Sequence, residues 1–150
     1  MTKADNTIKK AKSWLGYSES NGKAMKYIIY PWDKKTGRSV TCSTPWCAIT
    51  VSSLLMQCKV KCFSMSSSCK TQRAYFKKHK RWLSADTRPW KGLIIFIEGH
   101  EGIVTSTRSN GTGYYISGNC LNAVRTSKFN WKTKKKGKKK VLGYGKPNYN

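Results

Sequence analysis

The spacing of apolar residues changes a little past the middle of the chain. Before Arg88-Pro89, apolar residues recur at intervals of three and four, as in the set Ala4, Ile8, Ala11 and Leu15. After it, a continuous apolar run covers residues 93–97, and Asn-Gly and Gly-Asn pairs separate the short segments that follow. Such pairs are typical of turns between antiparallel strands. Helices followed by an antiparallel sheet indicate a fold of the α+β class.

The same patterns predict the individual elements. We expect helices over residues 4–15, 24–29, 43–56 and 69–82, with the second one short and ending before Pro31. Residues 33–44 are polar and are expected to form a loop. Ser43 or Thr44 can cap the third helix, and Pro45 suits its first turn. Strands are expected over residues 93–97, 102–107, 114–117, 123–129 and 141–144.

The length of the chain predicts a single domain. A chain of 150 residues and 17.0 kDa can bury one core, so residues 1–150 are expected to fold together as a monomer. Its apolar runs are too short for a transmembrane helix. The N-terminal segment is polar, without the apolar stretch of a secretory signal peptide. We therefore expect synthesis in the cytoplasm without such a peptide.

The charge of the chain points to an anionic partner. Thirty Lys and Arg residues face six Asp and Glu residues, which gives a formal net charge of +24. A fold of this size cannot neutralise that charge internally, so nucleic acid, anionic lipid and anionic bacterial wall polymer all qualify as partners.

Residues 132–140, here called the Lys-rich segment, hold seven of these lysines. Like charges at this density repel one another, so we expect a loop or the tip of a hairpin. Two interpretations stay open: the segment is merely solvated, or it captures a polyanion. The candidate polyanion-binding residues are Lys134, Lys135, Lys136, Lys138, Lys139 and Lys140.

The six cysteines allow several roles. They are Cys42, Cys47, Cys58, Cys62, Cys69 and Cys120. An even number suits disulfides in a secreted protein, although no export signal is present. The spacing of Cys58, Cys62 and Cys69 fits a structural zinc site poorly, so no metal is expected. A core or disulfide role for most of these thiols is the simplest interpretation.

Cys47 is the cysteine that the predicted elements place at the start of a helix. A helix N-terminus lowers the pKa of a thiol through the backbone dipole and its unpaired N–H groups, and a neighbouring histidine adds to that effect. Cys47 is thus a candidate nucleophile. The alternative is a small core residue without chemistry.

A nucleophilic thiol needs a base, and the sequence offers His79 and His100. His79 lies among lysines and arginine in a segment expected to be solvated, whereas His100 follows a buried strand at a tight turn. A histidine at the rim of a rigid sheet can reach over the start of a helix. His100 is therefore the preferred base.

The base needs a polar partner for its second ring nitrogen. Glu101 should face away from His100, because side chains alternate along a strand. Asn119 ends a later strand that can pair beside the His100 strand, where its amide can hold the imidazole or support an oxyanion. The alternative is that Gly118-Asn119 simply forms a turn.

The order of these segments resembles the CHAP family, the cysteine, histidine-dependent amidohydrolases/peptidases of phage endolysins and bacterial wall hydrolases. The likeness is carried by residues 46–48 (WCA), 92–96 (GLIIF), 100–104 (HEGIV) and 118–119 (GN). Residues 12–19 (KSWLGYSE), 122–125 (NAVR) and 143–147 (GYGKP) extend it to nearly the whole chain.

This resemblance implies a papain-like fold, with N-terminal helices packed on a C-terminal antiparallel sheet, that hydrolyses an amide bond in peptidoglycan without a cofactor. Cys47 matches the nucleophile, His100 the base and Asn119 the polar partner, while Ser117 and Trp46 are candidate supporting residues. The implied partners are peptidoglycan and anionic wall polymers, reached after release from the cytoplasm as in phage or prophage lysins.

The sequence departs from the family pattern at three positions. Ser117 replaces a frequent acidic residue. Residues 92–94 are Gly-Leu-Ile where the family usually has Gly-Asp-Ile, and Glu101 replaces a small apolar residue after the histidine. Without the acid at position 117, Asn119 alone supports the imidazolium, so a slow or inactive enzyme is an open outcome. Two other classes also stay open: a noncatalytic protein that binds nucleic acid or wall polymer, and a secreted toxin held by disulfides.

Overall fold

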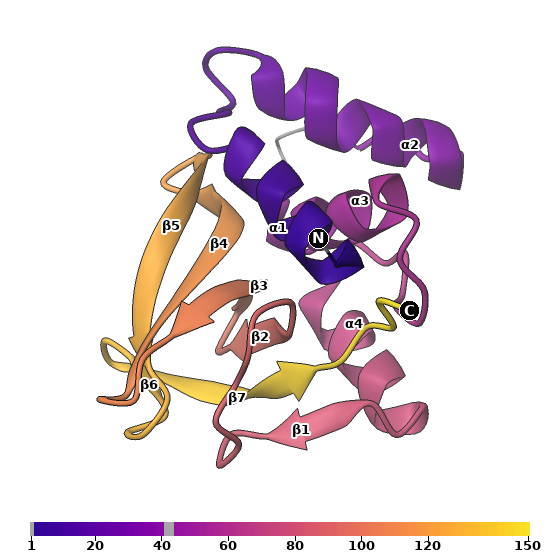
Figure 1. Ribbon diagram of the computed structural model, residues 1–150. Helices are drawn as coiled ribbons and strands as arrows, with labels where there is room; N and C mark the ends of the chain where they lie inside the picture. The colour runs from indigo at the N-terminus through magenta and orange to yellow at the C-terminus, as the bar shows by residue number, and fades with distance from the viewer. Residues whose placement is uncertain (1, 41–43) are drawn as a thin grey trace.

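The computed structural model describes residues 2–40 and 44–150, and it confirms the α+β class. Helices gather on one side of the molecule and strands on the other (Figure 1). The predicted cap Ser43 and the cysteine Cys42 lie outside the described residues.

Five helical segments precede the strands. They are α1 (Lys3–Ser13), the π-helical turn η1 (Met25–Ile29), α2 (Tyr30–Thr36), α3 (Cys47–Gln57) and α4 (Cys69–Lys78). The helices are not confined to the N-terminal end, because α4 lies in the middle of the chain. In the part of the chain described, no helix has the length and hydropathy needed to cross a lipid bilayer.

Two predicted helix boundaries are wrong. Residues 33–36, expected in a loop, are helical because η1 continues directly into α2, with Pro31 near the junction of the two segments. The fourth helix was expected to reach residue 82. It ends at Lys78, and Trp82 begins strand β1 (Trp82–Ser84) instead.

The start of α3 also differs from the prediction. Trp46 is the N-cap, and Thr44 and Pro45 precede the helix. Among the described residues, no side chain caps this end of α3. Its first N–H groups are therefore not satisfied by a capping oxygen, which leaves them directed at the region around Cys47.

The strands form one antiparallel sheet in the order β1-β7-β2-β3-β4-β5-β6. Besides β1, they are β2 (Ile94–Ile97), β3 (His100–Thr107), β4 (Thr112–Cys120), β5 (Ala123–Asn130), β6 (Lys135–Lys136) and β7 (Lys139–Gly145). A further pairing of β6 with β7 closes the sheet on itself. Strands β1 and β6 were not predicted, since segments of three and two residues are too short to show a pattern.

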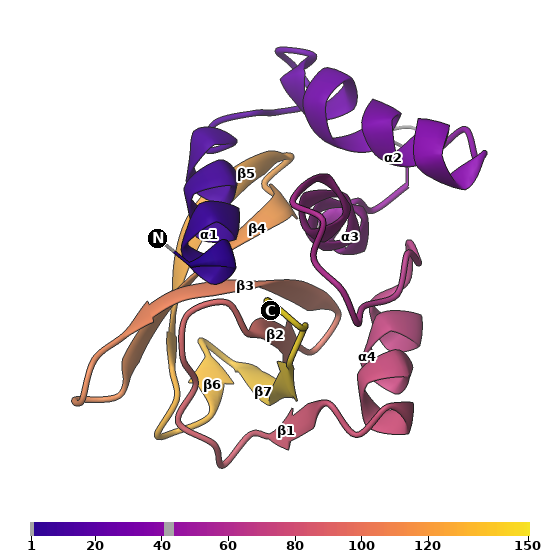
Figure 2. The ribbon, with the colours of Figure 1, turned by 45° about the vertical axis from the view of Figure 1, so that its right-hand side comes forward.

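Alternate residues of β2 pack into two different cores. Ile94 and Phe96 join the helices in one apolar cluster, whereas Ile95 and Ile97 join side chains of β3, β4, β5 and β7 in a second one. Helix α3 lies between α2 and the strands (Figure 2), and residues 47–55 are all buried. The first turn of α3 is therefore held rigidly against β3 and β4.

Candidate active site

Cys47 is the first residue of α3, as the sequence predicted to within one turn. Only 6% of its surface is exposed. The positive end of the α3 dipole favours a negative charge at this position. The thiol thus lies at the inner end of the site, against β3 and β4, and not on the outer surface.

A second thiol, that of Cys69, lies next to it. The two Sγ atoms are 3.5 Å apart, and Cys69 is the first residue of α4, whose N-cap Ser68 accepts a hydrogen bond from the N–H of Thr71. The Gln72 side chain donates to the carbonyl of Ala48 at 2.9 Å and so ties α4 to the first turn of α3.

The sequence analysis missed this second thiol. A helix over residues 69–82 was predicted, but Cys69 at its start was not considered as a reactive thiol, although the serine directly before it is a capping signal. Two helix N-termini thus converge on one pair of sulfur atoms.

The neighbours of Cys47 favour its thiolate. A hydrogen bond from the Cys69 thiol lowers the pKa of Cys47 well below its ordinary value, against the effect of burial, and the His100 imidazole and the backbone N–H of Glu101 lower it further. The pKa of Cys69 is raised, first by its hydrogen bond to Cys47 and then by burial. The two pKa directions favour the thiolate on Cys47, with Cys69 as the S–H donor.

His100 and Asn119 share one cavity. The half-buried His100 begins β3, and it lines a cavity of about 410 Å³ together with Asn119. Asn119 lies at a bulge near the end of β4 with φ of 56°, a left-handed conformation that asparagine tolerates better than most residues. Cys47 interacts with His100 but is not among the residues that line this cavity.

His79 lies elsewhere. It is the exposed C-cap of α4, where it stacks on Tyr75 with ring centroids 4.0 Å apart. Its Nδ1 is 2.9 Å from the carbonyl of the same tyrosine. The geometry therefore favours His100 over His79 as the base.

Three lysines also line this cavity. Lys136, Lys138 and Lys139 line it together with His100 and Asn119. They belong to the Lys-rich segment, which forms the hairpin of β6 and the start of β7. Lys134 pairs instead with Asp86, outside the cavity. The sequence analysis treated this segment separately from the predicted catalytic residues.

Glu101 is a buried acid beside the thiol pair. Its side chain has no exposed surface, and neither carboxyl oxygen has a hydrogen-bond partner among the described residues. Burial, together with the charge on Cys47, raises the pKa of Glu101. The carboxyl group is therefore held in its neutral form at pH values where an exposed glutamate is ionised.

The two candidate supporting residues are both buried. The indole Nε1 of Trp46 donates to Glu19 at 3.1 Å. A Cβ atom on Gly118 would lie 2.0 Å from Thr50 Oγ1 and 2.8 Å from the Trp46 ring, so β4 approaches α3 very closely here. The Ser117 hydroxyl has no hydrogen-bond partner among the described residues, and neither Ser117 nor Trp46 lines the cavity.

Within the part of the chain that the structure describes, the other cysteines and the acidic residues do not form a metal site. Cys47, Cys58, Cys62, Cys69 and Cys120 are free thiols. Over residues 2–40 and 44–150, no group of three or more His, Cys, Asp or Glu side chains is arranged to hold a metal ion.

Comparisons with family models, with curated proteins and with solved structures found no significant match to the chain.

Proposed function

We propose that the protein is a cysteine-dependent amidohydrolase or peptidase that cleaves an amide bond in peptidoglycan. The observation that carries this proposal is the Cys47 thiol, whose pKa is lowered by Cys69 and His100 at the start of α3. The reaction class follows from this thiol and base, and the substrate follows from the resemblance to the CHAP family and its papain-like fold.

The mechanism uses one covalent intermediate. The Cys47 thiolate attacks the carbonyl carbon of the amide, the C–N bond breaks, and protonated His100 gives its proton to the leaving amine. The acyl group is then held as a thioester on Cys47. His100 next takes a proton from water, and the resulting hydroxide releases the carboxylic acid and restores the thiolate.

Asn119 acts on this reaction from the cavity wall. Its amide either orients the imidazole of His100 or donates to the oxyanion of the tetrahedral intermediate. Ser117 cannot supply the negative charge of an acidic residue, which reduces stabilisation of the imidazolium. We therefore expect a slow enzyme.

The direct test is lysis of purified cell walls. The parent protein should clear a wall suspension and release new amino groups, and Cys47→Ala should do neither. Cys58→Ala is the matched control, because Cys58 is a free thiol at the opposite end of the same helix. Equal lysis by the parent and Cys47→Ala would contradict the proposal.

Access to the buried thiol needs its own measurement. Native protein is treated with iodoacetamide, and each modified cysteine is identified by peptide mass spectrometry. Because a thiolate is the reactive form, Cys47 should be alkylated at a pH where Cys58 is not. A Cys47 that stays unmodified until the protein unfolds would show that no substrate reaches it.

A second function is favoured by the exposed lysines of the Lys-rich segment. A noncatalytic protein of this charge would bind nucleic acid or anionic wall polymer through these lysines and the basic residues 70–82. Binding to duplex DNA would then fall with salt, with a log–log slope of roughly −0.9 per phosphate contacted. Affinity that does not change with salt, or no affinity, would exclude this second function.

A further inference from the structure

We propose that the cavity lined by His100 and Asn119 is a carboxylate subsite, in which Lys136, Lys138 and Lys139 bind an acidic group of the substrate beside the cleaved amide. This inference depends on the proposed hydrolase function, and it further specifies that the preferred substrate carries a negative charge.

The hairpin that carries these lysines has a defined turn. Lys136 pairs with Lys139, so Gly137 and Lys138 form a two-residue connection. Gly137 has φ of 61° at the first of these positions, whereas Lys138 has no positive φ. This combination is typical of a type II′ turn, which matches the twist of the two strands. The three lysines are thus held on an ordered hairpin.

The hairpin is also tied to the turn that leads to His100. The carboxylate of Glu98 accepts a hydrogen bond from the Lys140 N–H at 2.7 Å, and the Glu98 N–H donates to the Lys140 carbonyl at 3.2 Å. Glu98 lies two positions before His100 in the chain. These bonds hold the backbone of the hairpin beside the turn that precedes His100.

The charges of the cavity lysines are not neutralised by the protein. In the described part of the chain, the ion pairs are Lys91–Asp5 and Lys134–Asp86, and neither involves a cavity lysine. Glu98 and Glu101 are not among the cavity-lining residues. Three ammonium groups around one cavity repel one another, and a bound anion relieves this repulsion.

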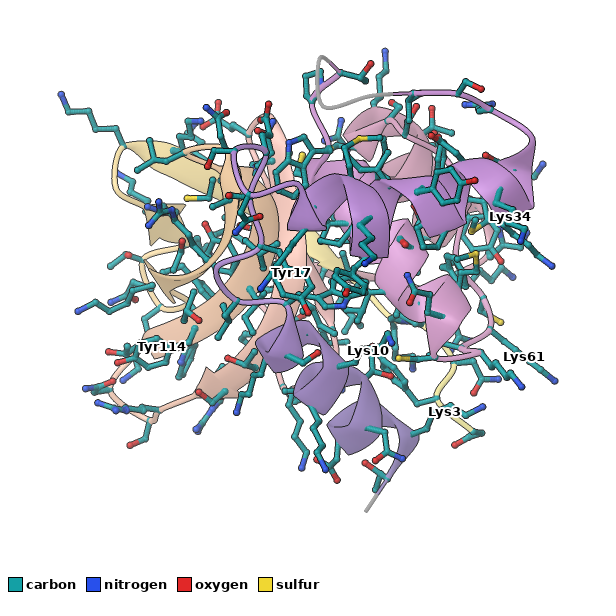
Figure 3. All side chains as sticks on the ribbon, turned by 90° about the horizontal axis from the view of Figure 1, so that it is seen from above. Lys3, Lys10, Tyr17, Lys34, Lys61 and Tyr114 are labelled. Atoms are coloured by element: carbon teal, nitrogen blue, oxygen red, sulfur yellow. The ribbon has the colours of Figure 1, made fainter. Side chains whose placement is uncertain are left out.

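The rest of the cavity suits an organic acid. Ile97 and Tyr115 give it an apolar wall, and Asn119 can donate a hydrogen bond. In a substrate peptide that has a carboxylate near the cleaved amide, the carboxylate would lie at the lysines and the carbonyl of the cleaved amide would face His100. Lys34 and Lys61 lie on the helical side of the molecule, opposite the strand that carries Tyr114 (Figure 3).

The test compares two muropeptides that share one stem tetrapeptide. One has free carboxylates, and in the other every carboxylate is amidated. Binding is measured by calorimetry in a Cys47→Ala background, where no turnover occurs. We expect the Cys47→Ala protein to bind the muropeptide with free carboxylates about tenfold more tightly than the amidated one, which is the effect of a few exposed charge pairs. This preference should shrink as salt is added.

Two variants of equal net charge locate the effect. Lys136→Gln/Lys138→Gln/Lys139→Gln should bind both muropeptides with the same affinity. Lys9→Gln/Lys12→Gln/Lys34→Gln removes three exposed charges from α1 and α2 and should keep the preference. Circular dichroism checks that both variants are folded. Equal binding of the two muropeptides by the background protein, no binding, or a preference that survives in the first variant contradicts the subsite.

The outcomes separate this inference from the function on which it depends. If the preference is present but the protein with Cys47 releases no amino groups from either muropeptide, the subsite stands and the hydrolase proposal fails. If that protein cleaves both muropeptides with equal kcat/KM, the hydrolase proposal stands and the subsite fails.

Discussion

The sulfur atoms of Cys47 and Cys69 lie 3.5 Å apart, although 22 residues separate them in the chain. Each cysteine begins a helix, α3 or α4, so the positive ends of two helix dipoles meet at this pair. The arrangement stabilises one thiolate in a largely buried place, because Cys69 can donate its S–H to Cys47.

Replacing Cys69 should therefore make Cys47 less acidic. In Cys69→Ala the hydrogen-bond donor is lost, so the rate of alkylation of Cys47 at pH 6 should fall about tenfold or more. Cys69→Ser keeps a hydrogen-bond donor, so its rate of Cys47 alkylation should lie between those of Cys69→Ala and the parent. The measurement is the pH profile of iodoacetamide modification at Cys47, and identical profiles for Cys69→Ala and the parent would refute the role of Cys69.

The buried carboxyl of Glu101 should make stability depend on pH. Its folded pKa is raised, so stability is highest below the unfolded pKa and falls as pH rises toward the folded one. Each unit of difference costs about 1.4 kcal/mol at high pH. Glu101→Gln cannot ionise, so it should be more stable than the parent at pH 8 relative to pH 4. The measurement is the urea midpoint of each protein at pH 4 and pH 8. The same change in midpoint between these pH values for the parent and Glu101→Gln would contradict the prediction.

Asn119 offers a way to separate backbone strain from chemistry. Asn119→Gly keeps the left-handed conformation at φ of 56° but removes the amide, so kcat should fall by roughly 10²-fold while stability stays nearly unchanged. Asn119→Ala should lose the same activity and also about 1 kcal/mol of stability. Amine release and urea unfolding measure the two effects. Full activity in Asn119→Gly would exclude Asn119 from the mechanism.

Gly118 allows β4 to approach the first turn of α3. The methyl group in Gly118→Ala would overlap Thr50 Oγ1, 2.0 Å away, so we expect a loss of about 1–3 kcal/mol in unfolding free energy. Thr50→Ala removes that oxygen and should partly restore stability in the double variant. Denaturant unfolding of the four proteins tests this. Additive losses in the double variant would show that the two residues are not in contact.

The sequence alone determined the α+β class and the approximate limits of most elements. Helical spacing and turn residues are local signals, so they located the helix that begins near Cys47 and the strand that begins near His100. The same local signals were insufficient where a segment was short. They missed β1 and β6, because pairing with other strands stabilises these elements more than local preference does, and they missed the helical residues 33–36, which continue η1.

The tertiary structure decided which side chains meet. It put Cys69 beside Cys47, buried Glu101 next to both, and placed Lys136 and its neighbours at the same cavity as His100. These contacts join segments that are tens of residues apart and that come together through the packing of α3 and α4 and the closure of the sheet through β6 and β7. The periodicity of apolar residues shows which face of a helix or strand is buried. Which other element packs against that face depends on how all the elements pack together.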